Sequence, residues 1–230
     1  MKISKASIIA SSIASILLVA CASQQTDPGP TAAAVTPPHP DEITGIKWKV
    51  GDTCVTEYRF GYKRVVHTAV VTDVTSERTI LSDTADDGSS RVIVYEGADG
   101  GIVAKKVAVS NGEQIEFAPP MKWLTFPLKP GLTWTDQSVV KGQTFQLNLS
   151  TKFEARTWEA ITVPAGQFAA VKVTADETYT AGRNRKGESF TGGGTVTYWM
   201  APDSKCPVKW QYKNTFGDKT TMQLLSYKDG

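Results

Sequence analysis

The chain has 230 residues, of which 40% are hydrophobic, with 25 basic and 23 acidic side chains. Two lysines lie in an N-terminal segment that is expected to be cleaved, so the rest of the chain carries 23 basic and 23 acidic residues. This balance leaves no broad positive field, and it argues against nucleic acid as a partner. The hydrophobic content is enough for one well-packed domain.

Residues 1–20 have the layout of an export signal. Two lysines form a short positive region, residues 8–19 are apolar with Ser and Ala interspersed, and the small Ala20 precedes Cys21. The stretch is too short and too rich in Ser for a membrane-spanning helix, and it therefore predicts a cleaved signal peptide.

Leu18–Cys21 reads Leu-Val-Ala-Cys and resembles the lipobox of bacterial lipoproteins. The resemblance implies that cleavage precedes Cys21, that its sulfur carries a diacylglycerol, and that the membrane is a partner through this lipid. Two or more acyl chains anchor a protein stably. The alternative is an ordinary secretory signal followed by a chance cysteine. Ala22 stands where Asp would favour the inner membrane, so in a Gram-negative host it favours the outer membrane, facing the periplasm.

Residues 21–44 form the next segment, and they show no apolar period. Five prolines fall between Ala22 and Pro40. This composition predicts a disordered, partly polyproline-II tether. His39 lies in the tether and is not a catalytic candidate.

Residues 45–230 alternate in the way that β-strands do. Period-two runs occur at 145–155, 169–179 and 208–212, and residues 195–200 are β-branched and aromatic. Turns or breaks are predicted at Asp87-Gly88, Asp99-Gly101, Asn111-Gly112, Pro119-Pro120, Pro130-Gly131 and Pro164-Gly166. No helical period follows the signal. We therefore expect one all-β domain, a curved antiparallel sheet that forms a half-barrel or a barrel.

Cys54 and Cys206 are the two cysteines of the predicted domain. An exported protein meets an oxidising compartment, where two such cysteines usually pair. The expected disulfide would close a loop of about 150 residues and join the first strand to one of the last. The alternative is two buried free thiols. A metal site is not indicated, because neither cysteine has a His or Cys at ligand spacing.

Catalytic motifs are absent from the sequence: it has no nucleophile elbow, zinc-protease motif, P-loop or dinucleotide fingerprint. His67 reads as a strand side chain, and the acidic stretch with Asp86 and Asp87 reads as a hairpin turn because it lacks calcium-loop spacing. The basic loop 183–187 reads as solvated, with contact to lipid or polysaccharide phosphates as the alternative. No cofactor is implied.

Aromatic residues gather in the C-terminal half of the chain, where strands favour them as core. Some could instead line an apolar cavity at a barrel mouth. Trp134, Tyr198, Trp199 and Trp210 are the candidate ligand contacts, with Trp134 and Trp199 expected on the concave face.

Three stretches together resemble a family of bacterial envelope proteins that share a domain of unknown function. They are the turn at 126–134, the Val-Pro-Ala-Gly-x-Phe corner at 163–173, and the Tyr-Trp-x-Ala-Pro strand with Pro207–Lys209. The resemblance covers about residues 120–228 and implies a lipocalin-like half-barrel akin to lipoprotein carriers. No reaction is attached to these residues, and Cys206 departs from the family pattern.

The sequence thus predicts a non-enzymatic envelope lipoprotein that binds an apolar or amphipathic ligand, or a partner in envelope assembly. A structural or interaction module of a membrane or secretion complex is the alternative. An enzyme acting on cell-wall or lipid substrates, working through His67 or Asp86 and Asp87, is the weakest hypothesis.

Overall fold

Residues 34–230 form one compact unit in the computed structural model. The structure describes residues 37–98, 101–109, 112, 114–181 and 190–230. Every secondary-structure element in these residues is a β-strand. They are β1 (Thr53–Phe60), β2 (Lys63–Val74), β3 (Arg78–Ala85), β4 (Ser90–Ala98), β5 (Gly101–Val109), β6 (Gln114–Thr125), β7 (Thr133–Lys141), β8 (Gln146–Val163), β9 (Gly166–Ala181), β10 (Phe190–Met200), β11 (Lys209–Asn214) and β12 (Lys219–Lys228).

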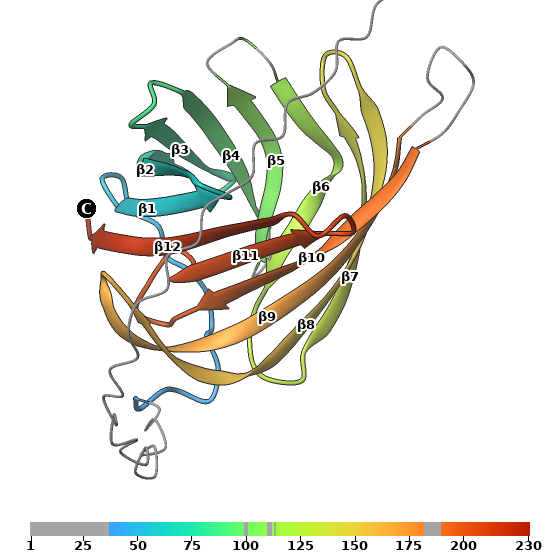
Figure 1. Cartoon of the computed structure of the whole chain (residues 1–230). Helices are drawn as coiled ribbons and strands as arrows, with labels where there is room; N and C mark the ends of the chain where they lie inside the picture. The colour runs from blue at the N-terminus through green and yellow to red at the C-terminus, as the bar shows by residue number, and fades with distance from the viewer. Residues whose placement is uncertain (1–36, 99–100, 110–111, 113, 182–189) are drawn as a thin grey trace, which may run out of the picture. The chain divides into compact units, whose positions relative to one another are not determined.

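The strands follow one another around a closed barrel (Figure 1). Every pair is antiparallel, and β1 closes the barrel by pairing with β12, with Cys54 opposite Tyr227. The all-β prediction is confirmed, and of the two expected shapes the sheet forms the barrel.

The alternating pattern of β8 shows how the sequence makes a core face. Phe153 and Ala155 belong to the main hydrophobic cluster and Leu149 packs against it, whereas Asn148 and Lys152, on the other parity, are exposed. Successive side chains of a strand point to opposite faces, so one parity faces the core. The same cluster takes Val173, Tyr198 and nine further buried residues from other parts of the described chain.

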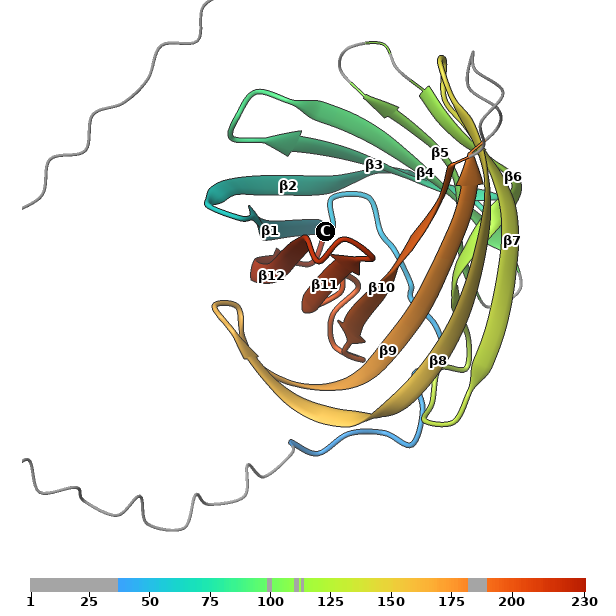
Figure 2. The same cartoon turned by 45° about the vertical axis from the view of Figure 1, so that its right-hand side comes forward.

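Strands β8 and β9 are much longer than usual, with 18 and 16 residues. A bulge between Ala155 and Trp158 interrupts their pairing, and bulges bend and twist a strand. The pair curves strongly (Figure 2), and the Ala165 N–H at its tip donates to the Leu224 carbonyl of β12 at 3.2 Å. A second cluster, with Ile161, Ala170 and Trp199, packs there.

Three of the predicted turns are confirmed. Asp87-Gly88 joins β3 to β4, Pro130-Gly131 precedes β7, and Pro164-Gly166 joins β8 to β9. Gly88 and Gly131 have φ near +85°, a conformation that L side chains rarely adopt. Asp99, Gly100 and Asn111 lie outside the described residues.

The predicted break at Pro119-Pro120 is wrong, because β6 runs through it. Proline cannot donate to a ladder and is tolerated where pairing is irregular. Here the β5 register jumps from Glu116 to Met121, and β7 pairs only with residues 116–118. Asp136 of β7 then accepts a hydrogen bond from the Lys122 N–H at 2.9 Å. The Asp136 side chain thus links β6 to β7 beyond the point where their backbone pairing ends.

The last residues of the predicted tether take part in the fold. Ile43 is buried, and its backbone exchanges two hydrogen bonds with Leu128, at 2.9 and 2.8 Å. His39 stacks on Trp158 with 4.2 Å between ring centroids. This contact gives His39 a packing role.

Cys54 and Cys206 form the predicted disulfide, with their Cα atoms 6.6 Å apart. Cys54 lies in β1, but Cys206 lies in the connection between β10 and β11. The expectation that the bridge joins two strands is therefore wrong. Hydrogen bonding between β1 and β12 closes the barrel, and the disulfide fastens a loop beside that seam.

Candidate functional site

A cavity of about 350 Å³ lies against the inner faces of β1–β6 and β10–β12. Its volume falls within the usual range of small-molecule sites. Most of its lining is apolar, and Leu81, Ile93, Phe117, Trp123, Trp210 and Met222 are representative. An apolar wall with a small number of polar groups is the usual composition of a ligand site.

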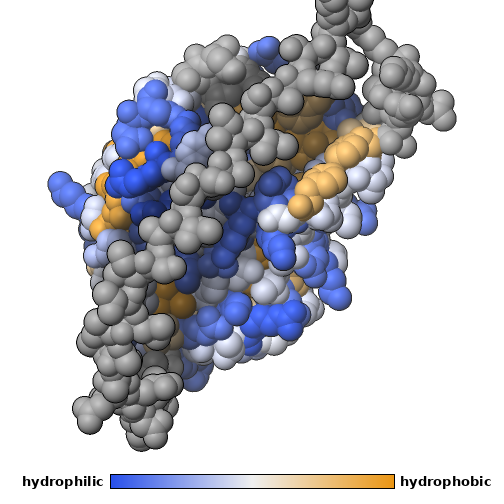
Figure 3. Space-filling model, in the orientation of Figure 1, coloured by the Kyte–Doolittle hydropathy of each residue, from blue (hydrophilic) through white to orange (hydrophobic). Residues whose placement is uncertain are grey.

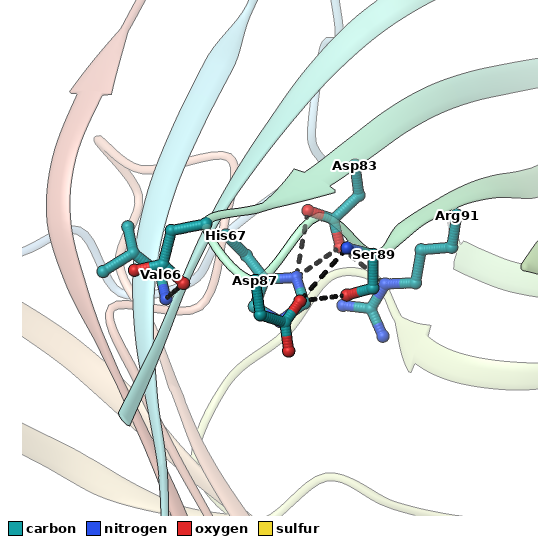
Figure 4. Close-up of polar contacts among 7 residues, drawn as sticks. Val66, His67, Asp83, Asp87, Ser89 and Arg91 are labelled. Carbon is teal, nitrogen blue, oxygen red and sulfur yellow. Dashed lines mark hydrogen bonds and ion pairs between the residues drawn. The ribbon is translucent and has the colours of Figure 1, made fainter. Parts of the chain in front are cut away.

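The polar groups of the cavity centre on Asp83 and Arg91, which face each other across β3 and β4 (Figure 4). Asp83 is only 2% exposed, and its carboxylate accepts a hydrogen bond from Arg91 Nε at 2.5 Å. His67 Nδ1 lies 3.1 Å from the same carboxylate. A buried carboxylate needs such partners, because losing its hydration without them is costly.

Two tyrosines complete this ionic corner. The ring of Tyr58 lies edge-on to His67, with 4.9 Å between centroids. Burial raises the pKa of Tyr58, although hydrogen bonding to Arg91 offsets part of the rise. Burial also raises the pKa of Tyr95 to about 12. Both phenols therefore stay neutral at physiological pH. Their hydroxyl groups lie beside Asp83 and Arg91, whose opposite charges are already paired with each other.

The opposite part of the cavity is lined by Trp48, the disulfide and Lys205. Lys205 Nζ lies 2.6 Å from Asp52, which is fully buried and also accepts the Gly230 N–H at 3.0 Å. Burial opposes the charged form of Lys205, but hydrogen bonds to Asp52 and Asp229 outweigh it and raise its pKa. This network holds Gly230 against the barrel, and the disulfide holds the β10–β11 connection against β1.

The four aromatic residues predicted to contact a ligand lie in different surroundings. Trp210 lines the cavity. Tyr198 is 1% exposed in the main core, where its hydroxyl donates to the Trp123 carbonyl at 2.8 Å. Trp134 stacks on Phe153, and its Nε1 donates to the Lys122 carbonyl at 3.2 Å. Tyr198 and Trp134 thus serve the core, and Trp123, which stacks on Tyr198, lines the cavity in their place.

Trp199 lies on the other side of the sheet from Tyr198, because neighbouring residues of a strand alternate. It belongs to the second cluster, so the expectation that it shares a face with Trp134 is wrong. Its Nε1 donates to Glu159 at 2.7 Å. The ammonium groups of Lys172 and Lys209 lie 5.6 and 5.0 Å from its ring centroid, within cation–π range.

The ionic corner was not among the predicted sites. A signal for it exists in the sequence, since Asp83 and Arg91 fall on the same parity as Leu81 and Ile93, the apolar positions of their strands. A charged residue at a core-facing position marks a buried polar site. Asp86 and Asp87, by contrast, lie in the β3–β4 turn, where Asp86 accepts the Val66 N–H at 3.0 Å.

Several predicted features lie outside the described residues: Cys21, the signal peptide and the basic loop 183–187. Among the described residues, no group of three metal-ligating side chains comes together. No helix in that part of the chain is long and apolar enough to cross a membrane.

Comparison with known proteins finds solved structures that resemble this chain in fold. No family model and no curated protein matches the chain. A Bacteroides fragilis structure described as an exported protein with a YmcC-like fold is 16% identical, with a TM-score of 0.55, and covers 83% of this chain and 100% of its own.

Two further solved structures are described as lipoproteins. One, from Parabacteroides distasonis, is 14% identical with a TM-score of 0.51, and covers 82% of this chain and 99% of its own. YmcC of Escherichia coli is 13% identical with a TM-score of 0.41, over 76% of this chain and 84% of its own. The first two likenesses show that this chain shares its fold with those structures.

Proposed function

We propose that this chain is a lipid-anchored envelope protein whose barrel binds an apolar or amphipathic small molecule without catalysis. The observation that carries the proposal is the cavity: mostly apolar walls surround the ionic corner formed by Asp83 and Arg91, and Lys205 lines the other end. Such a lining suits a ligand with a hydrocarbon body and a hydrogen-bonding head.

The location is part of the proposal. The lipobox ending in Cys21 supports acylation, and Ala22 supports the outer membrane, facing the periplasm. The neighbours described as an exported protein and as a lipoprotein share the fold, which is consistent with an envelope role. The disulfide supports export as well, since such bonds persist in oxidising compartments.

The ligand dimensions follow from the cavity. A volume of about 350 Å³ matches one acyl chain or a compact polycyclic molecule and is too small for a whole phospholipid. The matched charges of Asp83 and Arg91 leave no strong net charge, so the favoured head group is neutral or singly charged, such as a carboxylic acid or an alcohol.

Native mass spectrometry of the acylated protein, extracted gently from membranes, tests this function. We expect an adduct beyond the N-terminal acyl mass. Added lauric acid should bind and quench the fluorescence of Trp123 and Trp210, which line the cavity. Ala69→Phe, which projects a ring into the cavity, should abolish binding, whereas Thr72→Phe on the exposed side of β2 should not.

Two results would count against the proposal. A folded protein that carries no adduct and shows no quenching by lauric acid would exclude the ligand role. Equal binding by the Ala69→Phe and wild-type proteins would place the ligand elsewhere. In either case an envelope partner, captured by crosslinking in cells, becomes the next hypothesis.

A further inference from the structure

The closed antiparallel order places alternate connections at opposite ends of the barrel. The connections that follow odd-numbered strands, from β1–β2 to β11–β12, therefore share one end. The register supports this: Phe60 pairs with Thr220 where β1 ends and β12 begins, and Leu147 pairs with Ala181 where β8 begins and β9 ends. We call this the hairpin end.

Exposed aromatic side chains occur on four consecutive hairpins of this end. Phe145 lies on β7–β8, Phe190 on β9–β10, Phe216 on β11–β12, and Phe60 with Tyr62 on β1–β2. Their exposure ranges from 39% to 104%. These five residues, the aromatic arc, make up most of the large hydrophobic side chains that are exposed in the described part of the chain; the others are Val50 and Val92.

The aromatic arc is accompanied by exposed lysines. Lys141 precedes Phe145, and Lys213 and Lys219 flank the hairpin that carries Phe216. Among the described residues these three lysines have no ion-pair partner, whereas Lys63 lies 3.1 Å from Asp87. The acidic Asp86 and Asp87 sit on the β3–β4 hairpin, outside the arc. Asp218 sits on the Phe216 hairpin, where it accepts a hydrogen bond from Asn214 Nδ2 at 2.9 Å. Aromatic and cationic groups thus gather on one side of the hairpin end.

We propose that the aromatic arc docks onto the surface of a membrane that contains anionic phospholipid. The five aromatic side chains stand on four separate hairpins, and the coloured part of the surface in Figure 3 is mostly hydrophilic or neutral, with separate hydrophobic patches. Separate tips suit insertion into a fluid interface, where aromatic rings reside favourably. The unpaired lysines add attraction to anionic head groups, which screening by salt weakens.

The length of the chain before the barrel permits this contact. The residues from Cys21 to Pro37 span at most about 55 Å when extended, and β2, with its 12 residues, spans about 40 Å. An acylated Cys21 therefore does not prevent the hairpin end from reaching the membrane that holds the anchor. The surface-binding role does not depend on a ligand in the cavity.

Vesicle co-sedimentation tests the proposal without the anchor. A chain that starts at Ala22 keeps the whole compact unit, which begins at Ala34. We expect this chain to bind vesicles of phosphatidylethanolamine and phosphatidylglycerol, and to bind pure phosphatidylcholine vesicles more weakly. The triple variant Phe60→Ser, Tyr62→Ser and Phe216→Ser should bind about 100-fold more weakly, since each ring loses apolar contact area.

A double variant, Val50→Ser with Val92→Ser, is the matched control, because both valines are exposed outside the aromatic arc. It should bind like the wild type, and circular dichroism should show that all variants fold. Lys213→Gln with Lys219→Gln should weaken binding only to the anionic vesicles.

Equal binding by the triple variant and the control, or no binding by the wild type, would overturn the proposal. A dimer that forms in solution through the aromatic arc and dissociates in the triple variant would also overturn it, in favour of a second copy of the chain. If the wild-type protein binds vesicles but does not bind lauric acid, only the proposed cavity function is refuted.

Discussion

Glu177 gives the sharpest test of the interior of the barrel. It lies in β9, opposite Thr151 of β8, on the parity that faces the core. Thr151 is 1% exposed, and its hydroxyl has no hydrogen-bond partner among the described residues. The carboxylate of Glu177 likewise has no partner there, and burial raises its pKa from 4.5 to about 7.

The sign of the effect follows from linkage. A raised pKa means that the folded protein binds the Glu177 proton more tightly than the unfolded chain does. The stabilisation is fully present below pH 4.5 and is lost as the pH rises to about 7. At about 1.4 kcal/mol per pKa unit, the charged carboxylate costs the fold about 3 kcal/mol at pH 8.

Glu177→Gln removes this cost, because an amide resembles the protonated acid in shape and stays neutral. We expect the variant to match the wild type at pH 4.5 and to be more stable by about 3 kcal/mol at pH 8. Urea unfolding followed by tryptophan fluorescence at pH 4.5, 6, 7 and 8 measures the difference. Asp176→Asn is the matched control, since Asp176 is the exposed neighbour and accepts from Thr195 Oγ1 at 3.0 Å.

Equal free energies of unfolding for wild type and Glu177→Gln at pH 8 would refute the reasoning. So would a pH-independent gain, because it would point to packing or hydrogen bonding of the amide. A gain of the same size in Asp176→Asn would trace the effect to net charge.

Three further predictions concern stability. Cys206→Ser should lower the free energy of unfolding by up to about 5 kcal/mol, the chain-entropy value for a separation of 152 residues, and reduction should lower the wild-type melting temperature to that of the variant. Tyr198→Phe should cost about 1–2 kcal/mol in urea unfolding, because the Trp123 carbonyl loses its donor; no loss would mean that water replaces it. Asp83→Ala should cost about 2 kcal/mol by leaving Arg91 unpaired, and Asp83→Leu with Arg91→Met should restore much of it.

The strands could be predicted from sequence because each shows its buried parity locally. Phe153 and Ala155 alternate with polar residues, and turns at Gly88 and Gly131 need backbone that glycine supplies. Closure could not be predicted, since it depends on the pairing of β1 with β12, which are distant in sequence and carry no matching local signal. Pro119 and Pro120 misled for a related reason: whether a proline breaks a strand depends on the neighbouring register.

The site was harder to predict than the fold. Nothing in residue type separates Trp134, Tyr198 and Trp210. Their positions along the strands decide whether each side chain fills the core or borders the cavity. Trp199 shows the second difficulty. Both faces of β10 are buried near its end because the curved β8–β9 pair covers one of them. Alternation therefore no longer separates inside from outside.

The ionic corner of the cavity and the aromatic arc lie toward the same end of the barrel. Asp83 lies near the end of β3 and Arg91 near the start of β4, so the ionic corner is close to the hairpin end. The disulfide and Lys205 line the other end, where Asp52 binds the Gly230 N–H. If the aromatic arc rests on a membrane, the ionic corner lies nearer to the head groups, and the end lined by the disulfide and Lys205 lies farther from them. A ligand taken from that membrane would then enter with its hydrocarbon tail first and leave its head beside Arg91. Arg91→Met should therefore lower the affinity for lauric acid more than the affinity for dodecanol. Substitution of the aromatic arc should slow the transfer of both ligands from vesicles to the protein, without changing its affinity for either ligand in solution.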